Sequence, residues 1–280
     1  MGIRIITDST SDMSKEEAIR LGITIVPLKV IFGDREYREG IDISIEGFYE
    51  KLVQAEKLPT TSQPAPDDFL EYFLEAKEAG DSAIVMLISG KLSGTVQSAV
   101  IAKEMSNYQD IHIIDTNTSI NGLRILVEQA VKLREEGKSA VEIADTIHGL
   151  VDRLVLLAMV DTLEFLHKGG RLSKSSAFLG SLLKFKPILT VKEGLLCVIG
   201  KERGVNKGIA RMLESMEEFG EIDRNYPVHL GFTAENSKCM LLKEKLMEKY
   251  GLQDLKMFPV GCVVGTHAGP GASVVTYIKK

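Results

Sequence analysis

The chain has 280 residues, of which 44% are hydrophobic and 26% are charged, a composition typical of folded globular proteins. A chain of this length buries most of its apolar surface in one large or two ordinary domains, which excludes disordered, collagen-like and coiled-coil proteins. The formal net charge of −5 and the lack of a long lysine and arginine run give no general attraction to phosphate backbones or anionic lipid, so we expect no nucleic-acid partner.

Apolar stretches in the sequence are short. The longest, residues 154–160, is far below the roughly 20 residues needed to cross a bilayer, and residues 3–6 lead into polar residues without the features of a secretory signal. The three cysteines, Cys197, Cys239 and Cys262, have neither zinc-site nor disulfide-framework spacing. We therefore expect a cytoplasmic protein, in at most transient contact with membranes, whose thiols are buried.

The first half of the chain alternates short β-branched runs with segments of helical period, which is the pattern of a parallel α/β sheet. The predicted strands are residues 4–7, 24–30, 83–88 and 111–114, and the predicted helices are residues 15–21, 45–55, 67–79, 95–106 and 119–136. This order predicts a mostly parallel sheet with helices on both faces.

The pattern changes from residue 154 on. Residues 188–191 and 195–199 flank a Glu-Gly turn as a hairpin, which implies antiparallel pairing. The remaining predictions are helices at 206–219 and 234–250 and strands at 228–232, 255–259 and 274–278. We expect two closely packed α/β domains, residues 1–155 and a mixed-sheet domain at 156–280, with a ligand between and within them.

Polar residues gather after the strand predicted at 83–88. Ser93, Gly94 and Thr95 lie where this strand gives way to a helix, and Ser93 is predicted to be the N-cap. A helix start offers unpaired N–H groups and a partial positive charge, so this junction can hold a carboxylate or another anion. An ordinary serine cap explains the same residues. The spacing fits neither a nucleophile elbow nor a phosphate-binding loop.

Three further clusters are candidates for the same site. Thr61 and Ser62 stand between prolines that hold their segment extended, and with Ser93 they can hold a carboxylate without a competing fixed charge. Arg171 follows two glycines and can reach a phosphate or carboxylate. His267 lies in a predicted glycine-rich loop between two strands and is the functional candidate among the histidines. Turns and helix ends explain each cluster equally well.

The acidic residues near the start of the chain have a structural interpretation. Asp8 and Asp12 follow the first strand, and we expect them to cap the helix that begins near Ser14 rather than to bind a metal ion. No metal site is predicted.

Six motifs run in order through the whole chain. They are Thr7-Asp8-Ser9-Thr10-Ser11-Asp12, Thr61-Ser62-Gln63-Pro64, Leu92-Ser93-Gly94-Thr95 with Gln97-Ser98-Ala99, Gly169-Gly170-Arg171, Lys186-Pro187-Ile188, and Thr266-His267 with Gly269-Pro270-Gly271. In this combination the chain resembles the DegV family. The resemblance implies a bacterial fatty-acid-binding protein of two α/β domains, with the acyl chain buried and its carboxyl group near the interdomain opening.

The resemblance also assigns residues to the head-group site. Thr61 and Ser93 match the residues that hold the fatty-acid carboxyl group, and Ser62 and Gly94 are their neighbours. His267 and Arg171 match polar residues around the carboxyl end. The candidates for the wall of the acyl tunnel, which are equally consistent with ordinary core, are Phe165, Leu166, Phe178, Leu179, Leu182, Leu183 and Leu189.

The leading hypothesis is a non-catalytic lipid carrier without a cofactor, whose ligand is a long-chain free fatty acid such as palmitate, stearate or oleate. The resemblance further implies a partner, an ATP-binding fatty acid kinase subunit that phosphorylates the carboxyl group, with Arg171, Arg203 and His267 near the phosphoryl charge. Two alternatives stay open. One is a serine-dependent acyl hydrolase or transferase that uses Ser93 and His267, and the other is a binding protein for a phosphorylated or sugar ligand.

Overall fold

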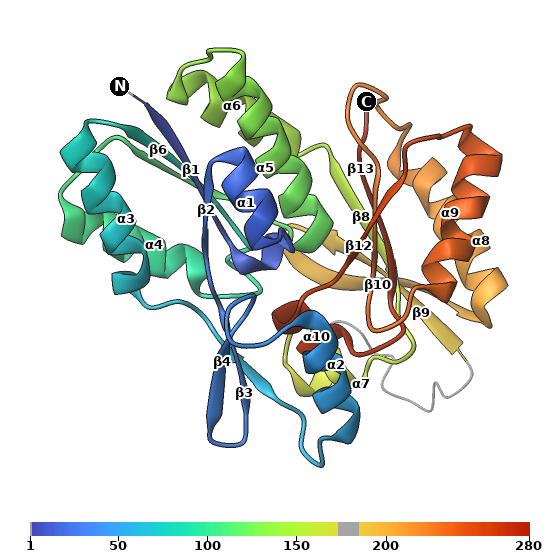
Figure 1. Cartoon of the computed structure of the whole chain (residues 1–280). Coiled ribbons are helices and arrows are strands. Elements are labelled where there is room, and N and C mark those ends of the chain that lie inside the picture. Colours follow the sequence, from blue (N-terminus) through green and yellow to red (C-terminus); the bar gives the residue numbers. More distant parts are fainter. Residues whose placement is uncertain (1, 173–184) are drawn as a thin grey trace.

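The computed structural model describes residues 2–172 and 185–280. Its strands form a four-stranded, a six-stranded and a three-stranded sheet, and Figure 1 shows helix α5 (Ile120–Glu135) between the first two. Among the described residues, no helix combines the length and hydrophobicity needed to span a membrane. The division into domains at residue 155 stays a prediction.

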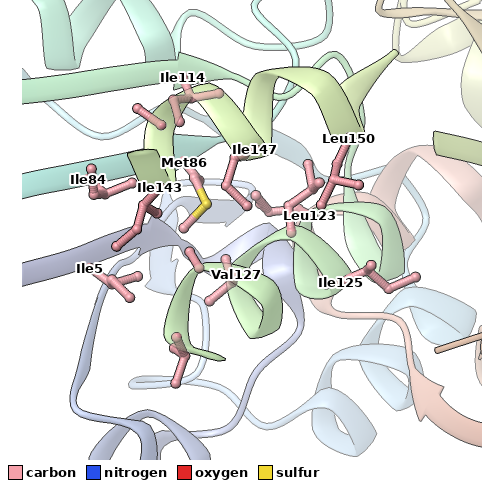
Figure 2. Close-up of a cluster of buried hydrophobic side chains, with 14 of the residues drawn as sticks. Ile5, Ile84, Met86, Ile114, Leu123, Ile125, Val127, Ile143, Ile147 and Leu150 are labelled. Carbon is pink, nitrogen blue, oxygen red and sulfur yellow. The ribbon is translucent and has the colours of Figure 1, made fainter. Parts of the chain in front are cut away.

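The four-stranded sheet is entirely parallel, in the order β2 (Ile23–Val26), β1 (Ile3–Asp8), β6 (Ser82–Leu87), β7 (Ile111–Asp115). Successive residues of a strand point to opposite faces, and both faces are covered by helices. Ile5 packs with α5 and α6 (Ala140–Val151), as Figure 2 shows, whereas Ile6 packs with α3 (Pro66–Ala79) and α4 (Thr95–Ser106). The predicted parallel sheet with helices on both faces is confirmed.

The strand predicted at 24–30 is wrong, because the chain divides there at Pro27. Proline lacks the N–H that a continuous ladder needs, so β2 ends at Val26 and β3 (Lys29–Phe32) joins a separate antiparallel sheet. Its neighbours are β4 (Arg35–Arg38) and β5 (Thr60–Ser62). The prediction missed both, because one is rich in charge and the other consists of three polar residues.

The six-stranded sheet is mixed. Its order is β10 (Leu195–Arg203), β9 (Phe185–Lys192), β8 (Leu154–Met159), β13 (Ser273–Ile278), β11 (His229–Phe232), β12 (Lys256–Pro259), and only β11 and β12 pair in parallel. The predicted hairpin is confirmed as β9 and β10. Helices α8 (Val205–Phe219) and α9 (Ser237–Tyr250) cover one face (Figure 1). The other face turns toward the parallel sheet.

Several local predictions are corrected by the structure. Residues 262–268 form helix α10 (Cys262–Ala268), which packs against α2 (Ile45–Gln54) and α7 (Glu164–Lys168), so His267 lies on a helix rather than in a loop. Helix α6 was not predicted. Cys197 is partly exposed, whereas Cys239 and Cys262 are buried as expected.

Three predicted caps also differ from the structure. Ser14, not Asp8 or Asp12, is the N-cap of α1 (Lys15–Leu21), because its hydroxyl can accept from the third N–H of the helix. Asp8 instead caps the short 3-10 helix η1 (Ser9–Ser11). At α4 the N-cap is Gly94 rather than Ser93.

Candidate functional site

A cavity of about 410 Å³ lies where the three sheets and helix α10 meet. Its size is within the range of sites that bury small organic ligands. The lining residues come from segments far apart in the sequence, and most are aliphatic: Leu28, Ile88, Leu92, Ile120, Leu156, Ala158, Val160, Leu166, Leu189, Val191, Leu196, Val260, Val263, Val264, Ala268, Ala272 and Val274.

Strand β8 shows how the six-stranded sheet makes one wall of the cavity. Val155, Leu157 and Met159 pack under α8 and α9, while Leu156 and Ala158 point to the opposite face and line the cavity. Because the strand period is two, one continuous apolar run supplies both a packed core and a cavity wall.

Thr61 and His267 form the first polar pair of the lining. Thr61 Oγ1 on β5 lies 2.9 Å from His267 Nε2 in the last turn of α10. Burial and the nearby charge of Arg171 lower the pKa of His267 to about 4, so the ring is neutral at physiological pH. Among the described residues, its buried Nδ1 has no hydrogen-bond partner.

Which nitrogen of the His267 ring carries the proton decides whether the Thr61 hydroxyl can donate a hydrogen bond to a ligand. A neutral imidazole carries its proton on one of two nitrogens. With the proton on Nε2, the ring donates to Thr61 Oγ1, and the threonine hydroxyl can donate to a ligand in the cavity. With the proton on Nδ1, the hydroxyl donates to the ring. The first form suits an anionic ligand, and it leaves Nδ1 as an unprotonated acceptor.

Ser93 lies directly before the N-terminus of α4. Its Oγ is 2.8 Å from Thr95 Oγ1, and no side chain caps the first turn of the helix at Gly94. Uncapped N–H groups at a helix start favour an anion. The serine hydroxyl and the start of α4 therefore form a second set of polar groups beside the cavity.

Gln63 joins the two hydroxyl-bearing segments. Its Nε2 donates to Gly94 O at 3.2 Å and to Ser98 Oγ at 2.9 Å, which ties the end of β5 to the start of α4. A Cβ at position 94 would collide with the Gln63 amide, so glycine at this position allows the close approach.

Arg171 supplies the positive charge of the site. Its Nε donates to Leu92 O at 3.1 Å and its Nη1 to Gly169 O at 2.7 Å. The guanidinium is therefore held by backbone carbonyls, and no carboxylate of the described residues forms an ion pair with it. Gly169 also lies against the His267 ring, because a Cβ there would collide with Nδ1.

Five of the six predicted site residues line the cavity: Thr61, Ser62, Ser93, Arg171 and His267. The sixth, Gly94, is adjacent as the N-cap of α4. Arg203, at the end of β10, is not among the lining residues.

Of the residues predicted to line the acyl tunnel, only some line the cavity. Leu166 and Leu189 line the cavity, Phe165 packs beside helices α2 and α10 instead, and Phe178, Leu179, Leu182 and Leu183 lie outside the described residues. The sequence interpretation missed Gln63, Ser119 and Thr233 as lining residues. Gln63 belongs to the motif Thr61-Ser62-Gln63-Pro64, so its polar amide beside two hydroxyls was an available signal.

The hydrogen bonds of Ser93 and His267 do not form the arrangement that a serine hydrolase needs. Within the described part of the chain, Ser93 pairs with Thr95 and His267 Nε2 with Thr61, so the serine–histidine hydrogen bond of an acyl hydrolase is not formed. A histidine with a pKa of about 4 is also a weak base at neutral pH.

The described residues contain no group of three or more His, Cys, Asp or Glu side chains arranged to hold a metal ion.

Comparison with known proteins identifies the family. A family model described as "Uncharacterised protein, DegV family" matches residues 2–280. The chain belongs to the DegV family. A DegV domain-containing protein of Caldanaerobacter subterraneus is 35% identical over 278 residues, which cover 99% of each chain.

Two solved structures of similar proteins are those of fatty-acid-binding proteins. A DegV family protein from Thermus thermophilus, described as binding fatty acid, is 34% identical, with a TM-score of 0.90 over 99% of this chain and 100% of that one. A stearic-acid-binding protein from Eubacterium ventriosum is 26% identical, with a TM-score of 0.89 over 99% of this chain and 98% of that one. The predicted family and α/β fold are thus confirmed.

Proposed function

We propose that this protein binds a long-chain free fatty acid, with its acyl chain in the cavity and its carboxylate among the polar groups of Thr61, Ser93 and the start of α4. The observation that carries the proposal is one aliphatic cavity whose lining includes the hydroxyls of Thr61 and Ser93, beside the start of α4, together with Arg171. The fatty-acid-binding relatives support the same ligand class.

The energetics favour an acyl chain. Each buried methylene contributes about 0.8 kcal/mol, so a chain of the palmitate, stearate or oleate class offers on the order of 10 kcal/mol before ordering costs. A carboxylate taken out of water is unfavourable unless it is hydrogen-bonded. Hydroxyls of Thr61 and Ser93, with Ser62, the Gly94 backbone and Arg171 nearby, supply those bonds and one compensating charge.

Neutral His267 acts through Thr61 in this arrangement. When the neutral ring donates from Nε2 to Thr61 Oγ1, the threonine proton is free to point toward the ligand. The chain is then a carrier, with no catalytic residue and no cofactor assigned to it.

The two alternative functions fit the cavity less well. A serine hydrolase needs His267 as the base of Ser93, and each of these residues has another partner. A sugar or small phosphorylated ligand would leave the aliphatic wall from β8, β9, β10 and β13 without a function. Covalent labelling of Ser93 by a fluorophosphonate, abolished in Ser93→Ala, would support the hydrolase instead.

Lipid extraction of the purified protein, followed by mass spectrometry, tests the proposal directly. We expect a long-chain acid in near-stoichiometric amount, bound again after delipidation and addition of palmitate. Failure of the delipidated, folded protein to bind any acid of this class would refute the proposed function.

We further propose that the bound carboxyl group is presented to a separate ATP-binding kinase subunit. Arg171 supports this step, since its charge lies in the lining that contains the hydroxyl groups and can stabilise negative charge on a transferred phosphoryl group. The test is to incubate the loaded carrier with ATP and a fatty acid kinase subunit, and to trap acyl phosphate as the hydroxamate. Hydroxamate that forms equally with Arg171→Ala would exclude this role for the arginine.

A further inference from the structure

Three carboxyl groups lie together behind the start of helix α10. Asp8 and Glu39 are buried, and Asp12 joins them from the segment after η1. A Cβ built on Gly261 would lie 2.5 Å from Glu39 Oε1 and 2.7 Å from Asp12 Oδ1. Both carboxylate oxygens therefore lie close to the Cα atom of Gly261. The site described above uses none of the three.

Two of these carboxyl groups hold the first turn of α10. Glu39 Oε1 accepts from Val263 N at 2.8 Å, and Asp12 Oδ1 accepts from Gly261 N at 3.0 Å. The other oxygen of Glu39 accepts from Ser9 Oγ at 2.6 Å. The N-terminal end of the helix is thereby fixed to the segments that follow β1 and β4.

The same helix carries a wall of the cavity and one member of the polar pair. Val263 and Val264 line the cavity, and His267 meets Thr61. The rise from Val263 to His267 is about 6 Å along a helix. Since a seven-residue helix of this kind has little stability of its own, its position depends on the contacts at its ends and sides.

The titratable groups of the cluster are mostly acids, with one cation among them. Asp8 on β1, Tyr49 on α2 and Cys262 on α10 face the two carboxyls that hold α10, and Arg124 on α5 is the cation that acts on Asp12. Arg124 donates to the backbone oxygen of Asp12 rather than to its carboxylate.

The charge of Arg124 is also shared. Its guanidinium pairs with Glu17 at 2.8 Å and lies 3.9 Å from Glu128. Among the described residues, the buried Oδ2 atom of Asp12 has no partner. One shared guanidinium does not neutralise three carboxylates, so the cluster retains a proton in the folded protein. Burial accordingly raises the pKa of Glu39 to about 7 and that of Asp8 to about 6.

We propose that Glu39 and Asp12 are positioning residues for the carboxylate site, which seat helix α10 so that His267 meets Thr61 while the cluster holds its proton. Loss of that proton adds a buried negative charge near the bound anion. Affinity for the fatty acid then falls as pH rises. The inference rests on the proposed function and concerns the same site.

The test compares palmitate binding by the wild type, Glu39→Gln and Asp12→Asn at pH 6 and pH 9. Each amide retains an oxygen that can accept from the α10 backbone but removes the ionisation, and asparagine also tolerates the positive φ of 54° at position 12. The surface variant Glu104→Gln is the matched control. Ionisation of the ligand itself is common to all four proteins, so the readout is the difference between their pH slopes.

For the wild type and Glu104→Gln we expect the dissociation constant to rise on the order of tenfold, the effect of one buried charge added near a bound anion. For Glu39→Gln the rise should be several-fold smaller. Glu39→Ala, which removes the acceptor, should bind weakly at both pH values.

The outcomes separate this inference from the proposed function. Wild-type binding that is independent of pH, or equal slopes for wild type and Glu39→Gln, would overturn the positioning role while fatty-acid binding stands. Should the folded wild type bind no palmitate at either pH, the proposed function fails and this inference with it.

Discussion

The parallel sheet and the six-stranded sheet are built from equally apolar strands, yet they bury them differently. In the parallel sheet, Ile5 and Ile6 each meet a pair of helices on their own side. In the six-stranded sheet, Leu157 meets helices α8 and α9, whereas Leu156 faces the cavity. On this side of the six-stranded sheet, α5 contacts β8, β11 and β13 but leaves Leu156, Leu189 and Val274 to line the cavity. Incomplete helix cover, rather than a change in strand composition, therefore makes space for a ligand.

The largest effect expected from this difference concerns two matched leucines. Leu87→Ala in β6 removes a fully packed side chain and should lower the free energy of unfolding by about 2 to 5 kcal/mol. Leu189→Ala in β9 should cost clearly less in the lipid-free protein, because Leu189 already borders the cavity. Urea unfolding of both variants measures the difference. Equal losses would indicate that the lipid-free cavity collapses.

A second prediction concerns the carboxyl cluster at the junction of the two regions. The pKa of Glu39 is raised from 4.5 to about 7 in the folded protein, so the folded state holds a proton that the unfolded state releases. The resulting stability is present below pH 4.5 and is lost as pH rises through 7, a change of about 3 kcal/mol.

Glu39→Gln cannot lose this proton and should flatten the decline in unfolding free energy between pH 5 and pH 8, as measured by urea unfolding at each pH. Glu104→Gln, an exposed counterpart, should keep the wild-type decline. Parallel curves for Glu39→Gln and the wild type would show that Glu39 titrates normally.

Two adjacent valines of β13 allow the packed face and the cavity face to be compared within one strand. Val275→Phe overfills the core under α8 and α9 and should cost about 1 to 3 kcal/mol of stability. Val274→Phe points into the cavity, and should leave stability nearly unchanged but prevent palmitate binding. Thermal unfolding and a binding assay on both variants are needed. A loss of binding by Val275→Phe alone would place the ligand on the wrong face.

The smallest predicted effects concern the head group. Thr61→Ala and Ser93→Ala should each keep the fold and weaken palmitate binding by about 1 to 3 kcal/mol, because a buried polar group loses its partner. Isothermal titration calorimetry gives the dissociation constants, with the surface variant Thr146→Ala as the control. Wild-type affinity in both variants would contradict the head-group assignment.

Local patterns were sufficient to predict most of the fold. Alternation of strand and helix signals indicated the parallel sheet, and the Glu-Gly turn indicated the β9 and β10 hairpin. Helix α10 was missed because its sequence contains Gly265 and β-branched residues, which disfavour helices. Its contacts with Phe48, Tyr49 and Glu39 come from distant parts of the chain, and they hold the helix in place.

Several residues of the cavity lining were predictable from the sequence, but their pairing was not. Thr61, Ser93, Arg171 and His267 could be named from motifs, yet the contact between Thr61 and His267 spans 206 residues. Nor could the sequence distinguish cavity wall from core, because Leu156 and Leu157 are the same residue type on opposite faces of one strand. That distinction depends on which helices cover the sheet.

A side chain at position 169 would disturb the site without changing any of its polar residues. Its φ of −76° is one that any residue adopts, so it is the neighbouring atoms, chiefly the imidazole ring of His267 and also the backbone oxygen of Phe165, that exclude a side chain. A single extra methyl group there would push His267 away from Thr61 and weaken the proposed carboxylate site. The strength of ligand binding can thus be changed by a mutation that alters no polar atom.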